Sequence, residues 1–289
     1  MNTKQITNLI ALSLLIAFRA SAQINTPQPS PAGSVSSLVG LTEVSIDYFR
    51  PGVKGREIFG TGDQYLIPYG EIWRNGANAG SIISFTTDVK IDGQNVKAGK
   101  YQIVSRPGAS SWDVMFITEM IGGNMNNYDD SIVVASVLVE PMKTASNVER
   151  MTFQIANISA DNTTADIQFA WADVMWNIPI EVSFHAKVME EIAAKTQVNP
   201  QNYVAAATYY LNAGENLDQA LEWMNKYLNV GKNDGQFWNV YTKAQILAKL
   251  GKKEEAIATA KDSMEKAKNW ANGDFGYVKR NQDLIDSLE

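Results

Sequence analysis

The sequence contains no cysteine and only one histidine, His185. A chain without cysteine forms no disulfide, thiolate metal site, iron–sulfur cluster or cysteine nucleophile. A single histidine cannot build a multi-histidine zinc site, and a histidine base needs a positioned partner. We therefore expect no cysteine- or histidine-based metal site or catalysis, and the sequence indicates no specific catalytic residue, metal ligand or cofactor.

The chain also lacks an excess of positive charge and, after its first 22 residues, any long apolar run. Its 25 Lys and Arg residues stand against 31 Asp and Glu residues, which gives a formal net charge of −6. Nucleic-acid binding needs basic side chains to neutralise phosphates, so we do not expect nucleic acid as a partner. A bilayer span needs about 20 apolar residues, so we expect no transmembrane segment.

The first 22 residues have the composition of a signal peptide. Lys4 precedes a mostly apolar stretch over residues 6–18, and Ala20-Ser21-Ala22 provides small residues for cleavage before Gln23. The alternative, an N-terminal membrane anchor, is disfavoured because the apolar stretch is short. The sequence predicts an exported protein, either periplasmic or secreted.

The rest of the chain predicts an α+β protein with two domains. Residues 23–41 include three prolines and are interpreted as a flexible lead-in. Residues 42–184 have the short, alternating strands of an antiparallel β-sandwich, with a hairpin at Asp92-Gly93. The apolar run at 132–139 is expected to be a buried central strand. Residues 185–289 form an all-α domain of helical hairpins.

Six helices are predicted in this second domain, and glycines mark several helix ends. Asn212-Ala213-Gly214 and Lys249-Leu250-Gly251 are each followed by a similar acidic and alanine-containing segment, and the two glycines are 37 positions apart. This pattern resembles tetratricopeptide repeats, whose period is about 34 residues. The resemblance implies a concave surface for a protein partner. An unrelated helical bundle with glycine caps remains the alternative.

Basic and aromatic side chains gather between residues 48 and 80, in an otherwise acidic domain. Such a cluster suits an anionic or polyhydroxyl small ligand, with a tryptophan stacking on it. The alternative is structural, since arginine and asparagine side chains often satisfy the main chain of long loops. The predicted ligand-binding residues are Arg50, Lys54, Arg56, Trp73, Arg74, Asn75 and Asn78.

Two segments of this region, residues 50–56 (RPGVKGR) and 68–78 (PYGEIWRNGAN), closely resemble the signature of bacterial domain family 2911, which has no known function. Later pieces agree with it: IDG at 91–93, KAGKY at 97–101 and WDV at 112–114. The resemblance covers about residues 30–182. It implies membership of a family of mostly exported proteins, common in Bacteroidetes-type bacteria, and carries no activity with it.

These observations favour an exported, non-catalytic binding or scaffolding protein of the cell envelope. A small-ligand site would lie in the β domain and a protein-partner surface on the helices. The alternative is a carboxylate-based hydrolase acting on envelope carbohydrate, which would need two acids about 5–10 Å apart in one cleft.

Overall fold

The computed structural model describes residues 26–196, 199 and 201–289. The chain divides into two compact units, Met1–Ser183 and Phe184–Glu289, which we call the β unit and the helical unit. The sequence placed the same division one residue later, between residues 184 and 185. The predicted signal peptide, residues 1–22, lies outside the described residues.

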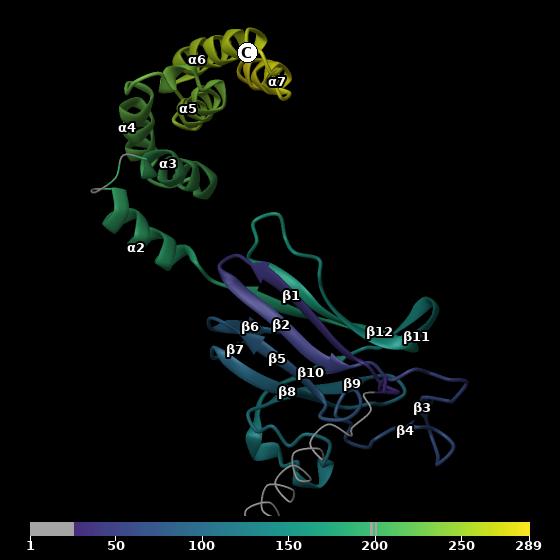
Figure 1. Cartoon of the computed structure of the whole chain (residues 1–289). Coiled ribbons are helices and arrows are strands. Elements are labelled where there is room, and N and C mark those ends of the chain that lie inside the picture. The colour runs from purple at the N-terminus through teal and green to yellow at the C-terminus, as the bar shows by residue number, and fades with distance from the viewer. Residues whose placement is uncertain (1–25, 197–198, 200) are drawn as a thin grey trace, which may run out of the picture. The chain divides into compact units, whose positions relative to one another are not determined.

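Two antiparallel sheets and one small parallel pair make up the β unit (Figure 1). The larger sheet has the strand order β1-β2-β5-β8-β9-β10, the second has the order β11-β12-β6-β7, and β3 pairs with β4. The strands are β1 (Ala32–Val39), β2 (Thr42–Phe49), β3 (Phe59–Gly60), β4 (Ile67–Pro68), β5 (Ser81–Phe85), β6 (Val89–Ile91), β7 (Gln94–Val96), β8 (Gly99–Arg106), β9 (Trp112–Ile117), β10 (Val133–Val139), β11 (Met142–Ala156) and β12 (Thr164–Val182).

Aromatic side chains from both large sheets meet in one core. Trp112 of β9 lies 5.8 Å from Phe169 of β12, measured between ring centroids. Tyr48 of β2 meets Phe153 of β11 edge to face at 5.3 Å. Large rings that pack with offset or edge contacts bury much apolar area, so this core holds the sheets together without any disulfide. The predicted mixture of antiparallel sheets and helices is confirmed.

The prediction of a flexible lead-in over residues 23–41 is wrong for residues 32–39. These form β1, which pairs along its whole length with β2, from Ala32 opposite Phe49 to Val39 opposite Thr42. Only Val39 of the eight residues is fully buried. The strand therefore lacks the alternating apolar face from which a strand is predicted. Its strand conformation depends on its pairing with β2 instead.

The apolar run at 132–139 is also not a central strand. Most of it forms β10, which lies at the edge of the larger sheet, and Leu138 is 74% exposed. The side chain of Gln94 covers part of this edge: its Nε2 donates to the Ser136 carbonyl at 2.8 Å and its Oε1 accepts from the Ser136 amide at 3.3 Å. An edge strand can thus be β-branched and apolar while remaining half exposed, provided that its main chain is partly paired.

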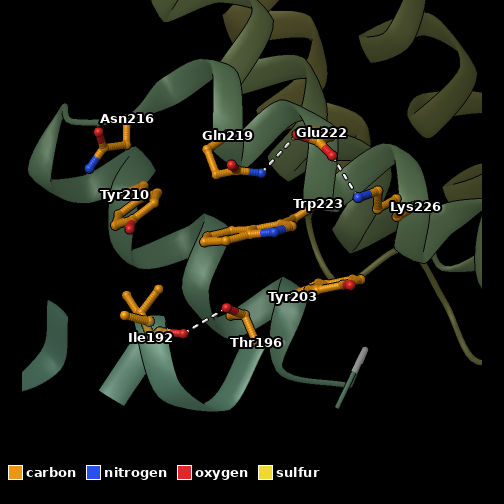
Figure 2. Close-up of a pocket in the computed structure, with 10 residues that line it drawn as sticks. Ile192, Thr196, Tyr203, Tyr210, Asn216, Gln219, Glu222, Trp223 and Lys226 are labelled. Atoms are coloured by element: carbon orange, nitrogen blue, oxygen red, sulfur yellow. Dashed lines mark hydrogen bonds and ion pairs between the residues drawn. The ribbon is translucent and has the colours of Figure 1, made fainter. Parts of the chain in front are cut away.

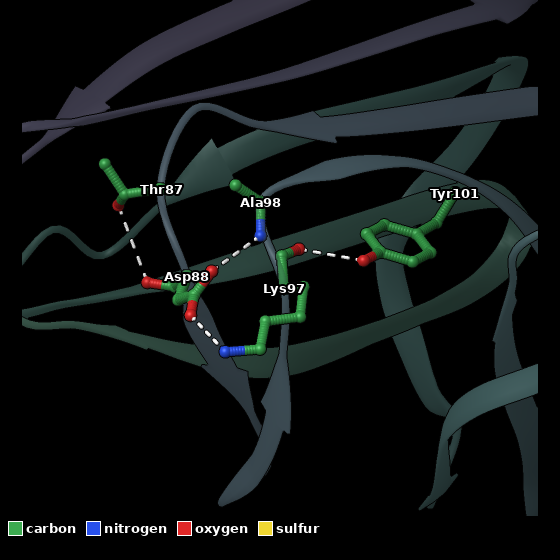
Figure 3. A network of polar contacts seen from close by, with 5 residues as sticks. All are labelled: Thr87, Asp88, Lys97, Ala98 and Tyr101. Atoms are coloured by element: carbon green, nitrogen blue, oxygen red, sulfur yellow. Dashed lines mark hydrogen bonds and ion pairs between the residues drawn. The ribbon is translucent and has the colours of Figure 1, made fainter.

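The predicted hairpin at Asp92-Gly93 joins β6 to β7, and the chain beyond it is held by a polar network (Figure 3). The Asp88 carboxylate accepts from the Ala98 amide at 2.9 Å and from Lys97 Nζ at 2.8 Å. The hydroxyl of Tyr101 donates to the Lys97 carbonyl at 2.8 Å. These contacts fix the passage from β7 into β8.

The helical unit contains six helices among its described residues, as predicted, and each helix packs against the next (Figure 1). Buried alanines such as Ala207 and Ala220 let neighbouring helices approach closely. Whether the array is a set of tetratricopeptide repeats stays a prediction. No helix of the described residues is long and apolar enough to cross a membrane. The helices are α2 (His185–Thr196), α3 (Asn202–Ala213), α4 (Leu217–Leu228), α5 (Phe237–Lys249), α6 (Lys253–Lys268) and α7 (Tyr277–Leu288).

Candidate functional site

The loops around β3 and β4 are tied to both large sheets. An irregular register in β11, between Val148 and Thr152, leaves Glu149 free to bond outside its own sheet. The Glu149 carbonyl accepts from the Val53 amide at 2.8 Å, and its carboxylate accepts from the Lys54 amide at 3.1 Å. A register irregularity of this kind commonly re-aims a strand. Here it holds the turn that carries Lys54.

On the other side, Trp73 is joined to β8. Its amide donates to the Ser105 carbonyl at 2.7 Å, and the Ser105 amide donates back to the Trp73 carbonyl at 2.8 Å. The indole enters the aromatic core, where it stacks on Trp171 with a centroid distance of 5.8 Å and an interplanar angle of 21°. Trp73 is therefore a core residue, 7% exposed, rather than a free surface platform.

These loops enclose a pocket of about 310 Å³, which we call the β-unit pocket. The volume falls in the range of small-ligand sites. Four of the seven predicted residues line it, namely Lys54, Arg56, Trp73 and Arg74. The other lining residues are Pro29, Ser30, Pro51, Gly52, Leu66, Ile67, Gly76, Ala77 and Trp171.

The lining of the β-unit pocket is rich in cations. Lys54, Arg56 and Arg74 belong to it, whereas no Asp or Glu is among the described residues that line it. None of these three cations forms an ion pair within the described part of the chain. The Arg56 guanidinium is oriented by its own loop, since Nη2 donates to the Gly52 carbonyl at 2.6 Å and Nε to the Val53 carbonyl at 3.1 Å.

Two lining residues also carry buried N–H donors with no acceptor among the described residues: Nε1 of Trp171 and Nε of Arg74. An unpaired buried donor is costly, and most buried polar groups in proteins are paired. The cations of the lining favour an occupant that supplies acceptor oxygens and negative charge.

The remaining three predicted residues do not line the pocket. The Arg50 guanidinium is used structurally: its Nε donates to the Met151 carbonyl at 3.2 Å and its Nη2 to the Thr152 hydroxyl at 2.9 Å. Asn75 is fully buried, and its Oδ1 accepts from the Ser105 hydroxyl at 3.2 Å. Asn78 is an exposed turn residue with a left-handed φ of 52°. For Arg50 and Asn75, the structural alternative is the one that the contacts favour.

Sequence reasoning missed the contributions of Pro29 and Trp171 to the pocket. Pro29 stands in the segment interpreted as a lead-in, and Trp171 lies in β12, outside the cluster at residues 48–80. Trp171 is 1% exposed, so only its position beside the pocket distinguishes it from other core tryptophans. No pattern in the sequence indicates this proximity, because the two residues are far apart along the chain.

A family model described as a protein of unknown function (DUF2911) matches residues 30–180, which is more than half of the chain. The chain belongs to this family. The DUF2911 region contains every strand of the β unit except the last residues of β12. It also contains all but one of the residues that line the β-unit pocket. The helical unit lies outside the DUF2911 match. No curated protein and no solved structure matches the chain significantly.

Proposed function

We propose that the protein is an exported, non-catalytic binding protein of the cell envelope, and that its β-unit pocket binds a small anionic ligand. The observation that carries the proposal is the lining of that pocket: three cationic residues, no carboxylate among the described lining residues, and two unpaired buried donors. A polyhydroxyl acid such as a uronate combines negative charge with further acceptors, and it is the ligand class that this lining fits best.

The charge of the rest of the chain makes this lining distinctive. The chain as a whole is acidic, with a net charge of −6. An anion would be repelled at long range and held only where local cations outweigh that repulsion. Lys54 and Arg56 provide such a place, because their charges are not already neutralised by ion pairs with described residues.

Export is supported by the sequence of the first 22 residues, with Lys4, the apolar stretch and Ala20-Ser21-Ala22. Mass spectrometry of the mature protein should find Gln23 at its N-terminus, and an uncleaved cytosolic product would contradict export. For the helical unit we propose a role as a surface for a protein partner, supported by its succession of packed helices.

The hydrolase alternative gains no support from this pocket. Carboxylate-based glycoside hydrolysis needs two acids facing the scissile bond. The described residues lining the β-unit pocket include neither Asp nor Glu.

The ligand site is tested by calorimetric titration of the purified chain with glucuronate, citrate and inorganic phosphate, with glucose as the uncharged comparison. Lys54→Glu reverses one charge in the pocket at a side chain that is exposed. We expect this variant to bind the anion about tenfold or more weakly, as expected when a charged contact is replaced by a repulsive one.

Lys100→Glu is the matched control, because Lys100 is an exposed lysine of β8 that does not line the pocket. It makes the same change in net charge and should leave the affinity within about twofold, since exposed charges are strongly screened at a distance. Equal losses of anion affinity in the two variants, or glucose binding that Lys54→Glu weakens as much as it weakens glucuronate binding, would contradict an anion site in this pocket.

A further inference from the structure

A second pocket lies within the helical unit, and we call it the helical pocket (Figure 2). Its volume is about 490 Å³. Residues from the end of α2, from α3, from α4 and from the turn before α4 line it. They are Ile192, Ala193, Thr196, Tyr203, Tyr210, Asn216, Gln219, Glu222, Trp223 and Lys226.

Aromatic rings form the centre of the helical pocket. Figure 2 shows the Trp223 indole lying across the pocket, with Tyr210 towards one of its faces and Tyr203 towards the other. Tyr203 is almost parallel to Trp223, at 5° and 6.1 Å between centroids, and Tyr210 stacks at 24° and 5.3 Å. With such separations the tyrosines overlap the indole only in part. Trp223 is half-buried, so part of its surface faces the open space.

The polar groups along the pocket neutralise one another. Lys226 Nζ lies 2.6 Å from Glu222 Oε1, and Gln219 Nε2 donates to Glu222 Oε2 at 2.9 Å. The hydrogen bond from Lys226, with the one from Gln219, lowers the pKa of Glu222, so the carboxylate keeps its charge. The pair therefore adds no net charge to the pocket, in contrast to the β-unit pocket, and does not select a charged ligand.

The size and walls of the helical pocket favour a compact ligand over an extended chain. Its volume lies within the range of small-molecule sites. Helices satisfy their own main-chain hydrogen bonds, so these walls offer no strand edge that could pair with an extended peptide. The available contacts are aromatic faces together with amide and carboxylate side chains.

We infer that the helical pocket binds an uncharged polyhydroxyl ring, a neutral mono- or disaccharide. The ring packs its C–H groups against the part of Trp223 that the two tyrosines leave uncovered, and its hydroxyls donate to Glu222 and accept from Gln219. This site is independent of the anion site proposed for the β unit, because the two pockets share no residue.

The test is saturation-transfer NMR and calorimetric titration of the purified chain with glucose, N-acetylglucosamine and cellobiose. Trp223→Ala removes the stacking surface and should weaken binding about tenfold or more, the loss expected when a stacking contact is deleted from a ring-binding site. Gln219→Ala removes only a partly exposed amide and keeps the aromatic packing. It should weaken binding several-fold while the helical unit stays folded by circular dichroism.

Trp270→Phe is the matched control, because Trp270 is a 39% exposed tryptophan of the same unit outside the pocket. It should bind the saccharide as the unmodified chain does. The inference is overturned if none of the three saccharides binds, or if Trp223→Ala and Gln219→Ala leave saccharide binding unchanged. A blocked Trp-Pro dipeptide serves as a peptide probe, and binding of this dipeptide instead of the saccharides would also overturn the inference. If Lys54→Glu abolishes saccharide binding while Trp223→Ala and Gln219→Ala do not, the saccharide binds in the β-unit pocket, which would also overturn the inference. Failure here leaves the glucuronate result untouched.

Discussion

Arg50 joins the end of β2 to β11: its Nε donates to the main-chain carbonyl of Met151 at 3.2 Å. Gly33 of β1 makes room for this side chain, since a Cβ there would lie 2.9 Å from the arginine Cδ. The bond spans about a hundred residues of sequence and connects the two large sheets. Arg50 is thus a structural residue placed beside the proposed site, and not part of its lining.

Replacing Arg50 should therefore lower stability and spare binding. Arg50→Ala removes two side-chain hydrogen bonds and leaves the Met151 carbonyl without its donor, which should cost about 1–3 kcal/mol in the free energy of unfolding. Urea unfolding measures this loss. Glucuronate affinity of the folded variant should stay unchanged. A stable variant that no longer binds would show that Arg50 contacts the ligand.

Trp73 is expected to behave as a core residue. It packs against Trp112, Phe169 and Trp171. Trp73→Ala should lower the free energy of unfolding by about 3–5 kcal/mol, because it leaves a cavity among large rings. Trp73→Phe keeps part of this packing and should lose less. Thermal unfolding of both variants checks the order, and a Trp73→Ala chain as stable as the original would contradict the packing.

Asn75 combines a buried hydrogen bond with a left-handed backbone, at a φ of 52°. Asparagine tolerates this conformation better than alanine does. Asn75→Ala should cost about 1–3 kcal/mol, since it deprives Ser105 of its acceptor and strains the backbone. Asn75→Gly loses the same bond but relieves the strain. In denaturant unfolding, its free energy of unfolding should therefore lie between those of the original chain and Asn75→Ala. A glycine variant less stable than the alanine variant would contradict a role for the backbone.

The Asp88 network makes a prediction about acid stability. The hydrogen bond from Lys97, followed by that from Ala98, lowers the pKa of Asp88 in the folded chain. A carboxyl whose pKa is lowered by folding stabilises the fold above its unfolded pKa, about 4, and loses this contribution as the pH falls through the folded pKa. Asp88→Asn should thus be less stable than the original chain at pH 7, and the difference should shrink towards pH 2.

Urea unfolding across that range measures the effect. Lys97→Met is the companion variant, because it removes the hydrogen bond from Lys97 and keeps the one from Ala98. Its difference in stability from the original chain should therefore change less with pH than that of Asp88→Asn. A difference between Asp88→Asn and the original chain that is constant from pH 7 to pH 2 would contradict the role of the charge.

The elements that sequence patterns predicted well are those specified by local physics. Asp92-Gly93 forms its hairpin because both residues adopt positive φ, at 47° and 76°. Gly214 ends α3 with a left-handed φ of 73°, as a helix-terminating glycine does. The strand β1 and the edge position of β10 were missed because pairing partners, rather than their own residues, decide them.

The candidate site was predicted in part for the same reason. Local composition identified Lys54 and Arg56, whose turn is built from adjacent residues. It could not separate them from Arg50, whose partners lie in β11, or bring Trp171 to the same pocket. These positions depend on how the two sheets pack against each other, and the residues of a single segment do not predict that packing.

The central claim, an anion site in the β-unit pocket, is tested most directly by a crystal structure of the chain soaked with glucuronate. We expect electron density for the ligand in this pocket, with its carboxylate within hydrogen-bond distance of Lys54 Nζ or the Arg56 guanidinium. An empty β-unit pocket at a concentration that saturates binding in solution would contradict the account.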